Sequence, residues 1–179
     1  MIYFTSDLHF FFKKFSRVGT RVFDSFEEKN EFLVTQWNSV VSEKYEVYIL
    51  GDVSNGGGAE TAEIIRRLNG KKYLVRGNND HYLDDPTFDE TVFEWCKDYY
   101  ELHTMGTKFI LFHFPIEVWC GCKNNRIHIH GHLHRLKPVW QLIRRYECGV
   151  DAHDGKPVSI EEIYSAVKNF DNSGVQLDR

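Results

Sequence analysis

The sequence lacks several features that would place it in a specialised class. It has no apolar run of transmembrane length, no cationic leader, no internal repeat and no low-complexity tract. Basic residues are not in excess either, because 22 Lys and Arg stand against 26 Asp and Glu, for a net charge of −4. We therefore expect a cytoplasmic protein with no membrane association and no obligate nucleic-acid partner. A length of 179 residues predicts one domain, at 1–170, before a mobile tail of low apolar content at 171–179.

Cysteine is also scarce, and its four residues are unevenly spaced. Cys120-Gly121-Cys122 has one residue between the two cysteines, whereas zinc ribbons and redox motifs have two. Cys96 and Cys148 do not form a second metal-binding knuckle with it. These features predict reduced cysteines in preference to disulfides.

What the sequence does contain is a run of histidines at positions 128, 130, 132 and 134. On a strand, a spacing of two places all four on one face. One interpretation is a polar strand face that contacts solvent. The other is that the strand ends near Gly131, and that the turn directs His132 and His134 at a metal ion. The stretch alone leaves both open.

The first half of the chain alternates apolar strands with helical segments. Strands are expected at 2–6, 46–50 and 72–76. A capping box at 25–28 predicts a helix to about Val41, and a second helix follows a glycine-rich loop and ends at Leu68. This alternation predicts a parallel sheet of the α/β class, in which polar residues after the strands gather at one edge.

The second half reads differently. We expect a short helix from Asp85-Pro86 to about Cys96, a hairpin of strands 99–103 and 108–112, strands at 126–130 and 139–146, and a helix from Ser159 to about Asn169. The aromatic cluster at positions 10, 11, 12 and 15 is interpreted as core in preference to a pocket wall.

Five polar loops, each after a predicted strand, carry metal-ligating residue types. They comprise two carboxylates, one amide and four imidazoles, namely Asp7, His9, Asp52, Asn78, His113, His132 and His134. Seven ligands are too many for one tetrahedral ion. They suit two adjacent divalent ions that share a bridging carboxylate. Mixed nitrogen and oxygen ligands favour Mn, Fe, Zn, Co or Ni over Mg or Ca.

The charge balance of such a site favours a small-molecule phosphate ester as substrate. Two carboxylates and a bridging hydroxide leave a residual charge of roughly +1 against two divalent ions, which attracts a phosphoryl group. A bridging water whose pKa falls to about 7 is a nucleophile at neutral pH, and the second ion stabilises the leaving oxygen.

The loops carry a series of short motifs, namely Asp7-Leu8-His9, Gly51-Asp52, Gly77-Asn78-x-Asp80, His113-x-Pro115 and Gly131-His132-Leu133-His134. In this order, the motifs resemble those of the calcineurin-like metallophosphoesterases over about residues 1–135. The setting is also similar to a small prokaryotic and phage branch of that family, through Trp37-Asn38, Leu68-Asn69-Gly70 and Gly149-Val150-Asp151.

The resemblance implies a four-layer α/β/β/α sandwich and a dinuclear metal-dependent phosphoesterase. Water bridging the ions would attack phosphorus in line, without a covalent enzyme intermediate. One metal would be held by Asp7, His9, Asp52 and His134. The other would be held by Asp52, Asn78, His113 and His132, so that Asp52 bridges them. His128 and His130 lie outside the motif and are interpreted as packing or supporting residues.

One position departs from the family pattern. The family often has Gly-Asn-His-Asp, and this chain has Asn79 where the His would be. Asparagine donates a hydrogen bond but does not transfer a proton at neutral pH. This favours a phosphodiesterase over a phosphomonoesterase, and His81 is a candidate substitute for the missing His. Asp80 is expected to orient a ligand, with His9 as the candidate.

Two further residues carry open alternatives. Arg76 either contacts the substrate phosphate or forms a surface ion pair, and Trp119 either lies at the substrate mouth or packs in the core. The rival function is a catalytically silent scaffold or binding module on the same fold. A nuclease would need a basic strip beside the site, which the net charge of −4 does not favour.

Overall fold

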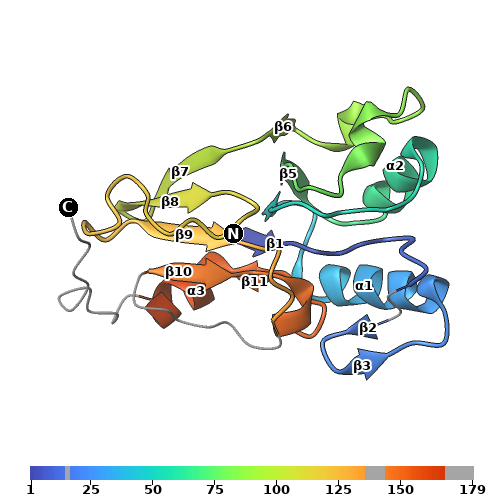
Figure 1. Ribbon diagram of the computed structural model, residues 1–179, viewed down its shortest axis with the longest axis horizontal. Helices are drawn as coiled ribbons and strands as arrows, with labels where there is room; N and C mark the ends of the chain where they lie inside the picture. The colour runs from blue at the N-terminus through green and yellow to red at the C-terminus, as the bar shows by residue number, and fades with distance from the viewer. Residues whose placement is uncertain (15–16, 136–143, 168–179) are drawn as a thin grey trace.

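The computed structural model describes residues 1–14, 17–135 and 144–167. Two β-sheets organise them (Figure 1). The first sheet has five strands, and all of its neighbouring pairs are parallel except β11–β1. In spatial order its strands are β11 (Val158–Ser159), β1 (Ile2–Thr5), β4 (Glu46–Ile49), β5 (Lys71–Val75) and β6 (Trp95–Lys97).

The second sheet has four strands. Its order is β10 (Arg145–Glu147), β9 (Ile127–His130), β8 (Thr107–Leu111) and β7 (Tyr100–Thr104). The first three are parallel, and β7 pairs antiparallel with β8 as the predicted hairpin. Its two-residue turn, Met105-Gly106, has φ of 52° and 69°, the positive values that a type I′ hairpin turn requires.

The two sheets face each other across an apolar core. Strand side chains alternate, so Phe4, Tyr48 and Leu50 face the second sheet, whereas their neighbours face the helices. The opposing face of the second sheet supplies Phe109, Leu111, Ile127 and Ile129. The other face of the first sheet packs on α1 and α2 through Tyr3, Val47, Ile49 and Leu74.

Helix α1 (Phe26–Val40) starts at the predicted cap, where Ser25 Oγ accepts the N–H of Glu28 at 3.2 Å. Its Trp37 is fully buried and donates through Nε1 to the carbonyl of Asn69 at 3.0 Å. The neighbouring Asn38 bonds the backbone of the same loop, which follows α2 (Gly58–Arg66). The Trp-Asn pair therefore ties α1 to the loop between α2 and β5.

Two further elements complete the layers. Helix α3 (Ile160–Val167) adds its buried face to the core between the sheets, and a complete capping box joins Ser159 and Glu162 before it. On the outer face of the second sheet, Ile110 packs against Trp119 and Cys122. The layered α/β prediction is thus confirmed.

The predicted helix between Asp85 and Cys96 is wrong. That segment contains a short 3₁₀ turn, Glu90–Val92, and then β6, and another 3₁₀ turn, His81–Asp84, precedes it. The side chains of Asp85 and Asp89 accept backbone N–H groups two residues ahead, which competes with helical hydrogen bonding.

A small hairpin of β2 (Arg17–Val18) and β3 (Arg21–Val22) follows the aromatic cluster and was not predicted. Of that cluster, Phe10 is fully buried as expected, whereas Phe12 lines a cavity. The first part of the strand predicted at 139–146, residues 168–169 of the last helix and the tail at 171–179 lie outside the described residues.

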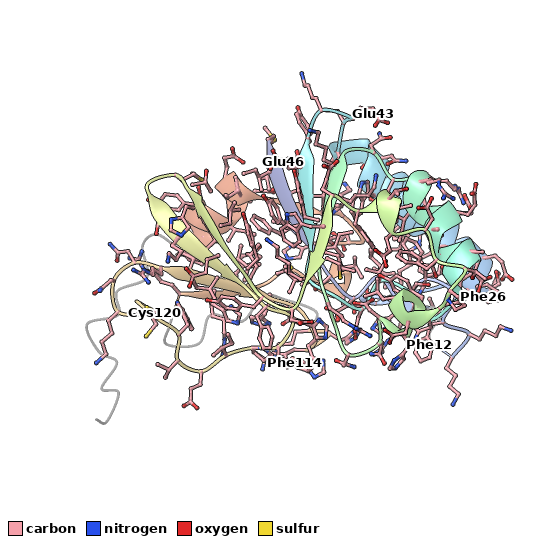
Figure 2. All side chains as sticks on the ribbon, turned by 90° about the horizontal axis from the view of Figure 1, so that it is seen from above. Phe12, Phe26, Glu43, Glu46, Phe114 and Cys120 are labelled. Atoms are coloured by element: carbon pink, nitrogen blue, oxygen red, sulfur yellow. The ribbon has the colours of Figure 1, made fainter. Side chains whose placement is uncertain are left out.

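The carboxyl ends of the parallel strands lie at one edge of the molecule. Figure 2 shows this edge between Phe12 and Phe114. The opposite edge carries Glu46, the first residue of β4, and Glu43 just before it. Within the described residues, no helix is both long and apolar enough to span a membrane. Cys96, Cys120, Cys122 and Cys148 form no disulfide.

Candidate metal centre

Six of the seven predicted ligands form two groups of three at this edge. Asp7, His9 and His134 make the first group, and Asp52, His113 and His132 make the second. Within each group, one ligand atom per residue lies within 4.8 Å of the others. The seventh, Asn78, places its Oδ1 atom 3.0 Å from His113 Nε2. The structure thus brings together residues that β1, β4, β5, β8 and β9 deliver to one edge.

The backbone around these ligands is strained. Left-handed conformations are uncommon for residues other than glycine, and they concentrate at functional sites. Five of the seven predicted ligands adopt one, with φ of 60° at Asp7, 44° at His9, 56° at Asp52, 73° at His132 and 50° at His134. Strands β1, β4 and β9 therefore turn sharply where they end, and these turns bring the five side chains into the site.

Glycines make room for these turns. A Cβ at Gly131 would lie 2.6 Å from Asp7 Oδ2, and one at Gly51 would lie 2.6 Å from His113 Nδ1. Gly131 lies between His130, the end of β9, and His132. Its lack of a side chain lets the loop after β9 approach the carboxylate of Asp7.

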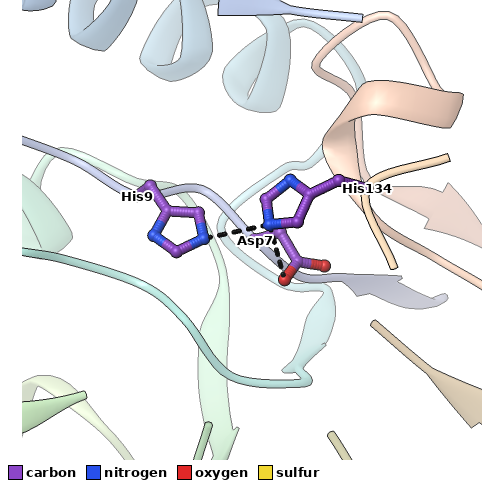
Figure 3. Close-up of side chains that lie close together, drawn as sticks. All are labelled: Asp7, His9 and His134. Atoms are coloured by element: carbon purple, nitrogen blue, oxygen red, sulfur yellow. Dashed lines mark hydrogen bonds and ion pairs between the residues drawn. The ribbon is translucent and has the colours of Figure 1, made fainter. Parts of the chain in front are cut away.

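In the first group, one ring nitrogen of His134 lies beside both the carboxylate of Asp7 and a ring nitrogen of His9 (Figure 3). His134 Nε2 lies 3.7 Å from Asp7 Oδ1 and 3.3 Å from His9 Nε2. Asp7 is 2 % exposed and accepts hydrogen bonds from Ser6 Oγ and the N–H of His132. Burial raises the pKa of Asp7 to about 6, against the opposing effects of His134 and of the Ser6 hydrogen bond.

The outer nitrogen of three rings is held by a fixed partner. His113 Nδ1 lies 2.7 Å from the Leu50 carbonyl and His134 Nδ1 lies 2.8 Å from Asp151 Oδ2, so each Nδ1 carries the proton. His9 Nδ1 pairs with Asn55 Oδ1 at 3.0 Å. In neutral rings, this leaves the lone pair of every Nε2 directed into the site, as in metal-ligating histidines with a fixed second hydrogen bond.

This donor set fits cations. The Nε2 atoms of His9 and His134 face each other at 3.3 Å, and Asn78 Oδ1 faces His113 Nε2 at 3.0 Å. In the tautomers above, both contacts bring two acceptors together with no proton between them. Divalent ions held by these atoms would remove the repulsion, and imidazole with carboxylate and amide oxygen suits transition metals.

Asp52 belongs to the second group and also lies beside the first. Its Oδ2 atom is 3.5 Å from His9 Nε2 and 3.6 Å from His113 Nε2. Asn79 holds the carboxylate in place, because its N–H donates to Oδ1 at 2.8 Å and its side-chain amide donates to Oδ2 at 2.7 Å. Asn79, at the position of the family's His and a candidate catalytic residue for that reason, therefore contacts Asp52 directly.

Asp80 contacts a predicted ligand other than the candidate His9, because it accepts the backbone N–H of Asp52. Asp80 is 1 % exposed and accepts three backbone N–H groups, from Asp52, Val53 and Gly77. It thereby holds the loop after β4 against the loop after β5. The residue that binds the outer nitrogen of His9 is Asn55. Asn55 follows Asp52 by three positions, at the start of the glycine-rich loop.

Histidines 128 and 130 stay in the scaffold, in line with the interpretation as packing residues. Both are buried on β9, and their Nδ1 atoms bond the carbonyls of Ile110 and Gly131. Trp119 packs its ring 5.3 Å from that of His128, so core packing is the alternative that the structure shows.

Two other candidates lie away from the ligand groups. Arg76 forms the ion pair that was its alternative role, with Asp84 Oδ2 at 2.7 Å. His81 is exposed at the start of the turn His81–Asp84. Neither residue joins the two groups described above.

Sequence reasoning missed two supporting residues, Asn55 and Asp151. Asp151 was noted within Gly149-Val150-Asp151, but no role was assigned to it. Its pKa is lowered because hydrogen bonds from His134 and the N–H of Gly19 outweigh the effect of burial, and it in turn raises the pKa of His134.

Comparison with known proteins agrees with this geometry. The model of the family described as calcineurin-like phosphoesterase matches residues 1–147. The chain belongs to the calcineurin-like phosphoesterase family.

Relatives of similar length support the membership. An uncharacterized protein of Methanocaldococcus jannaschii is 32% identical over 177 residues, which cover 93% of this chain and 91% of the relative. The Gene 66 protein of Mycobacterium phage L5 is 30% identical, with 94% of each chain covered. These are small prokaryotic and phage proteins, as the resemblance implied.

Solved structures share the fold. A protein of unknown function from Aquifex aeolicus has a TM-score of 0.69 at 24% identity, and the match covers 93% of this chain and 99% of that one. YfcE, a phosphoesterase from E. coli, has a TM-score of 0.51 at 19% identity, covering 83% and 77%. Family membership and the two ligand groups together support a metal-dependent phosphoesterase.

Proposed function

We propose that this calcineurin-like phosphoesterase is a dinuclear enzyme that hydrolyses a small-molecule phosphate ester by in-line attack of water, without a covalent intermediate. The observation that carries the proposal is the position of Asp52. One oxygen of this carboxylate lies within 3.6 Å of a ring nitrogen from each ligand group. A bridging ligand between two cations needs this placement.

The residues divide into two sets around Asp52. Asp7, His9 and His134 would hold one ion, while Asn78, His113 and His132 would hold the other. When bound, the ions would supply an activated water and stabilise the leaving oxygen. The chain itself excludes water from Asp7, Asp52 and His113, which are at most 2 % exposed, and fixes the rings through Asn55, Asp151 and Leu50.

A preference for diesters over monoesters is part of the proposal. Asn79 donates its backbone N–H and one side-chain N–H to Asp52 and does not carry a transferable proton at neutral pH. His81, the candidate substitute, is exposed and stands outside both ligand groups. Because neither Asn79 nor His81 supplies a proton to the leaving group, the site favours esters whose leaving group departs without protonation.

The decisive experiment is Asp52→Asn, with Asp98→Asn as the matched control at an exposed position. Hydrolysis of bis(p-nitrophenyl) phosphate with Mn²⁺ should fall at least about 1,000-fold in Asp52→Asn, which corresponds to about 4 kcal/mol of barrier. Metal analysis should find close to two ions in wild type and the control, and fewer in Asp52→Asn. Retention of most activity would overturn the bridging role.

A comparison of substrates tests the diester preference. p-Nitrophenyl phosphate and its bis ester share one leaving group, so their kcat/KM values isolate the effect of the second ester group. Cleavage of the monoester alone would overturn the preference. Absence of bound metal after supplementation would overturn the enzyme altogether and favour a scaffold on the same fold.

A further inference from the structure

A cavity of about 350 Å³ lies beside the first ligand group. Asp7, His9, His134 and Asn79 form one side of it, while the histidines of the second group do not line it. The site is therefore asymmetric, and an ester bound between the groups has room for its organic part on the His9 side.

Four apolar side chains line this cavity beside its polar groups. Leu8, Val18 and Val150 are each at most 4 % exposed, and Phe12 adds an aromatic ring that lies 5.7 Å from that of His9. Pockets for small organic molecules combine such walls with a few polar groups that fix orientation. An apolar cavity of about 150 Å³ already holds benzene, so this one has room for a substituted aromatic ring.

The hairpin of β2 and β3 closes the cavity and is tied to the metal site. Its residues Arg17 and Val18 line the cavity, and the N–H of Gly19 donates to Asp151 Oδ1 at 2.6 Å. The other oxygen of Asp151 bonds His134 Nδ1. One carboxylate thus joins the wall of the cavity to a candidate ligand.

Lys29 supplies a buried positive charge to the same cavity. Its side chain comes from α1, is 2 % exposed, and donates from Nζ to the carbonyls of His9 at 2.7 Å and Leu8 at 3.3 Å. An ammonium has three N–H donors. Two are used by these carbonyls, and the third has no hydrogen-bond partner among the described residues, so it can donate to an acceptor in the cavity.

We propose that this cavity binds the organic group of the ester and selects an aromatic ring that carries an acceptor or a negative charge for Lys29. The proposal rests on the function proposed above in that the phosphoryl group sits at the ligand groups. It adds the class of substrate: aryl phosphate esters with an anionic ring substituent, bound better than alkyl esters.

Binding of phosphonates tests this without turnover, because a phosphonate lacks the ester bond that would be cleaved. Calorimetry on the Mn²⁺-loaded protein should find phenylphosphonate about 10-fold tighter than methylphosphonate, from burial of the ring. The compound 4-carboxyphenylphosphonate should bind several-fold tighter still, and Lys29→Met should remove that additional gain while it leaves the gain from the ring. Equal affinities for the methyl and phenyl compounds, or no binding of any phosphonate, would overturn the proposal.

Two residues of the hairpin offer a matched pair. Val18 is 4 % exposed and lines the cavity, whereas Val22 on β3 is 78 % exposed. Val18→Trp should abolish the preference for the phenyl compound, and Val22→Trp should leave it unchanged. Phe12→Ala should enlarge the cavity and shift the binding preference from phenylphosphonate to 1-naphthylphosphonate. Misfolding would not produce such a shift. Absence of both effects would overturn the assignment of this cavity.

The outcomes also separate the two proposals. A preference for aryl phosphonates in a protein that cleaves no ester retains the cavity and overturns the enzyme. Hydrolysis with no preference between aryl and alkyl compounds retains the enzyme and overturns the cavity.

Discussion

The run 127–134 contains two pairs of histidines with opposite environments. His128 and His130 lie on β9, buried against backbone carbonyls, and burial lowers their pKa to about 4 and about 3. His132 and His134 follow Gly131 with positive φ, and the hydrogen bond to Asp151 raises the pKa of His134. Residue type and spacing are the same in both pairs. Backbone conformation and the nearest carboxylate separate a packing histidine from a candidate ligand.

The strand explains the first pair. Ile127 and Ile129 face the core between the sheets, so the alternating side chains of His128 and His130 face outward, where Trp119 covers His128. The left-handed residues after Gly131 end this alternation. A ring beyond that point is directed at the strand edge where Asp7 and Asp52 lie.

The largest expected difference concerns metal binding by the second pair. His132→Ala should lower phosphodiester hydrolysis at least about 1,000-fold, or about 4 kcal/mol, because a ligand of one ion is lost. His132 is only partly buried, so the substitution should change the free energy of unfolding of the metal-free protein by less than about 1 kcal/mol. Metal analysis and urea unfolding of the metal-free protein measure both. An unchanged metal content would remove the distinction between the pairs.

The first pair should show the reverse pattern. His128→Leu leaves the buried carbonyl of Ile110 and the half-buried N–H of Ile116 without their partner, at a cost of about 3 kcal/mol. Metal content per folded chain should stay at the wild-type value. Urea unfolding measures the loss of stability, and His128→Leu with wild-type stability but altered metal content would contradict the assignment.

The burial of His128 should also make the free energy of unfolding depend on pH under acidic conditions. His128 has a pKa of about 4 in the folded protein and about 6.5 when unfolded, so the unfolded state binds the proton more strongly. The stability contributed by the neutral ring is present above pH 6.5 and is lost as pH falls from 6.5 to 4. The loss should reach about 3 kcal/mol. His128→Gln, which does not titrate, should show a shallower dependence of unfolding free energy over this range, and an equal slope would contradict the shift.

Much of the fold followed from sequence patterns, because those patterns report burial directly. Short apolar runs located β1, β4 and β8, and the Ser25 cap located α1. Candidate ligands were found because parallel strands end at one edge, where five loops carried metal-ligating residue types. Local rules failed at Asp85 and Asp89, whose side chains bond nearby backbone and end helical pairing.

Residues that act through other residues were harder to predict. Asn55 and Asp151 reach His9 and His134 across long sequence separations, and neither carries a motif that names its partner. The partners of Asp80 were not predicted for the same reason, since its three backbone contacts depend on how two loops pack.

The smallest expected effect tests such an indirect role. Asp151→Asn keeps the size of the side chain but replaces the carboxylate that orients His134 through Nδ1 at 2.8 Å. Loss of this kind of partner typically costs 10- to 100-fold in metal affinity or activity, about 1.4 to 2.7 kcal/mol. Asp154→Asn is the control, because Asp154 is exposed in the same segment and its left-handed backbone suits asparagine. Titration of the metal-free protein with Mn²⁺ should show one of two sites weakened in Asp151→Asn and neither in Asp154→Asn. Weakening of both sites to the same extent would mean that Asp151 stabilises the loops as a whole and does not orient His134 specifically. The backbone conformation alone would then position His132 and His134.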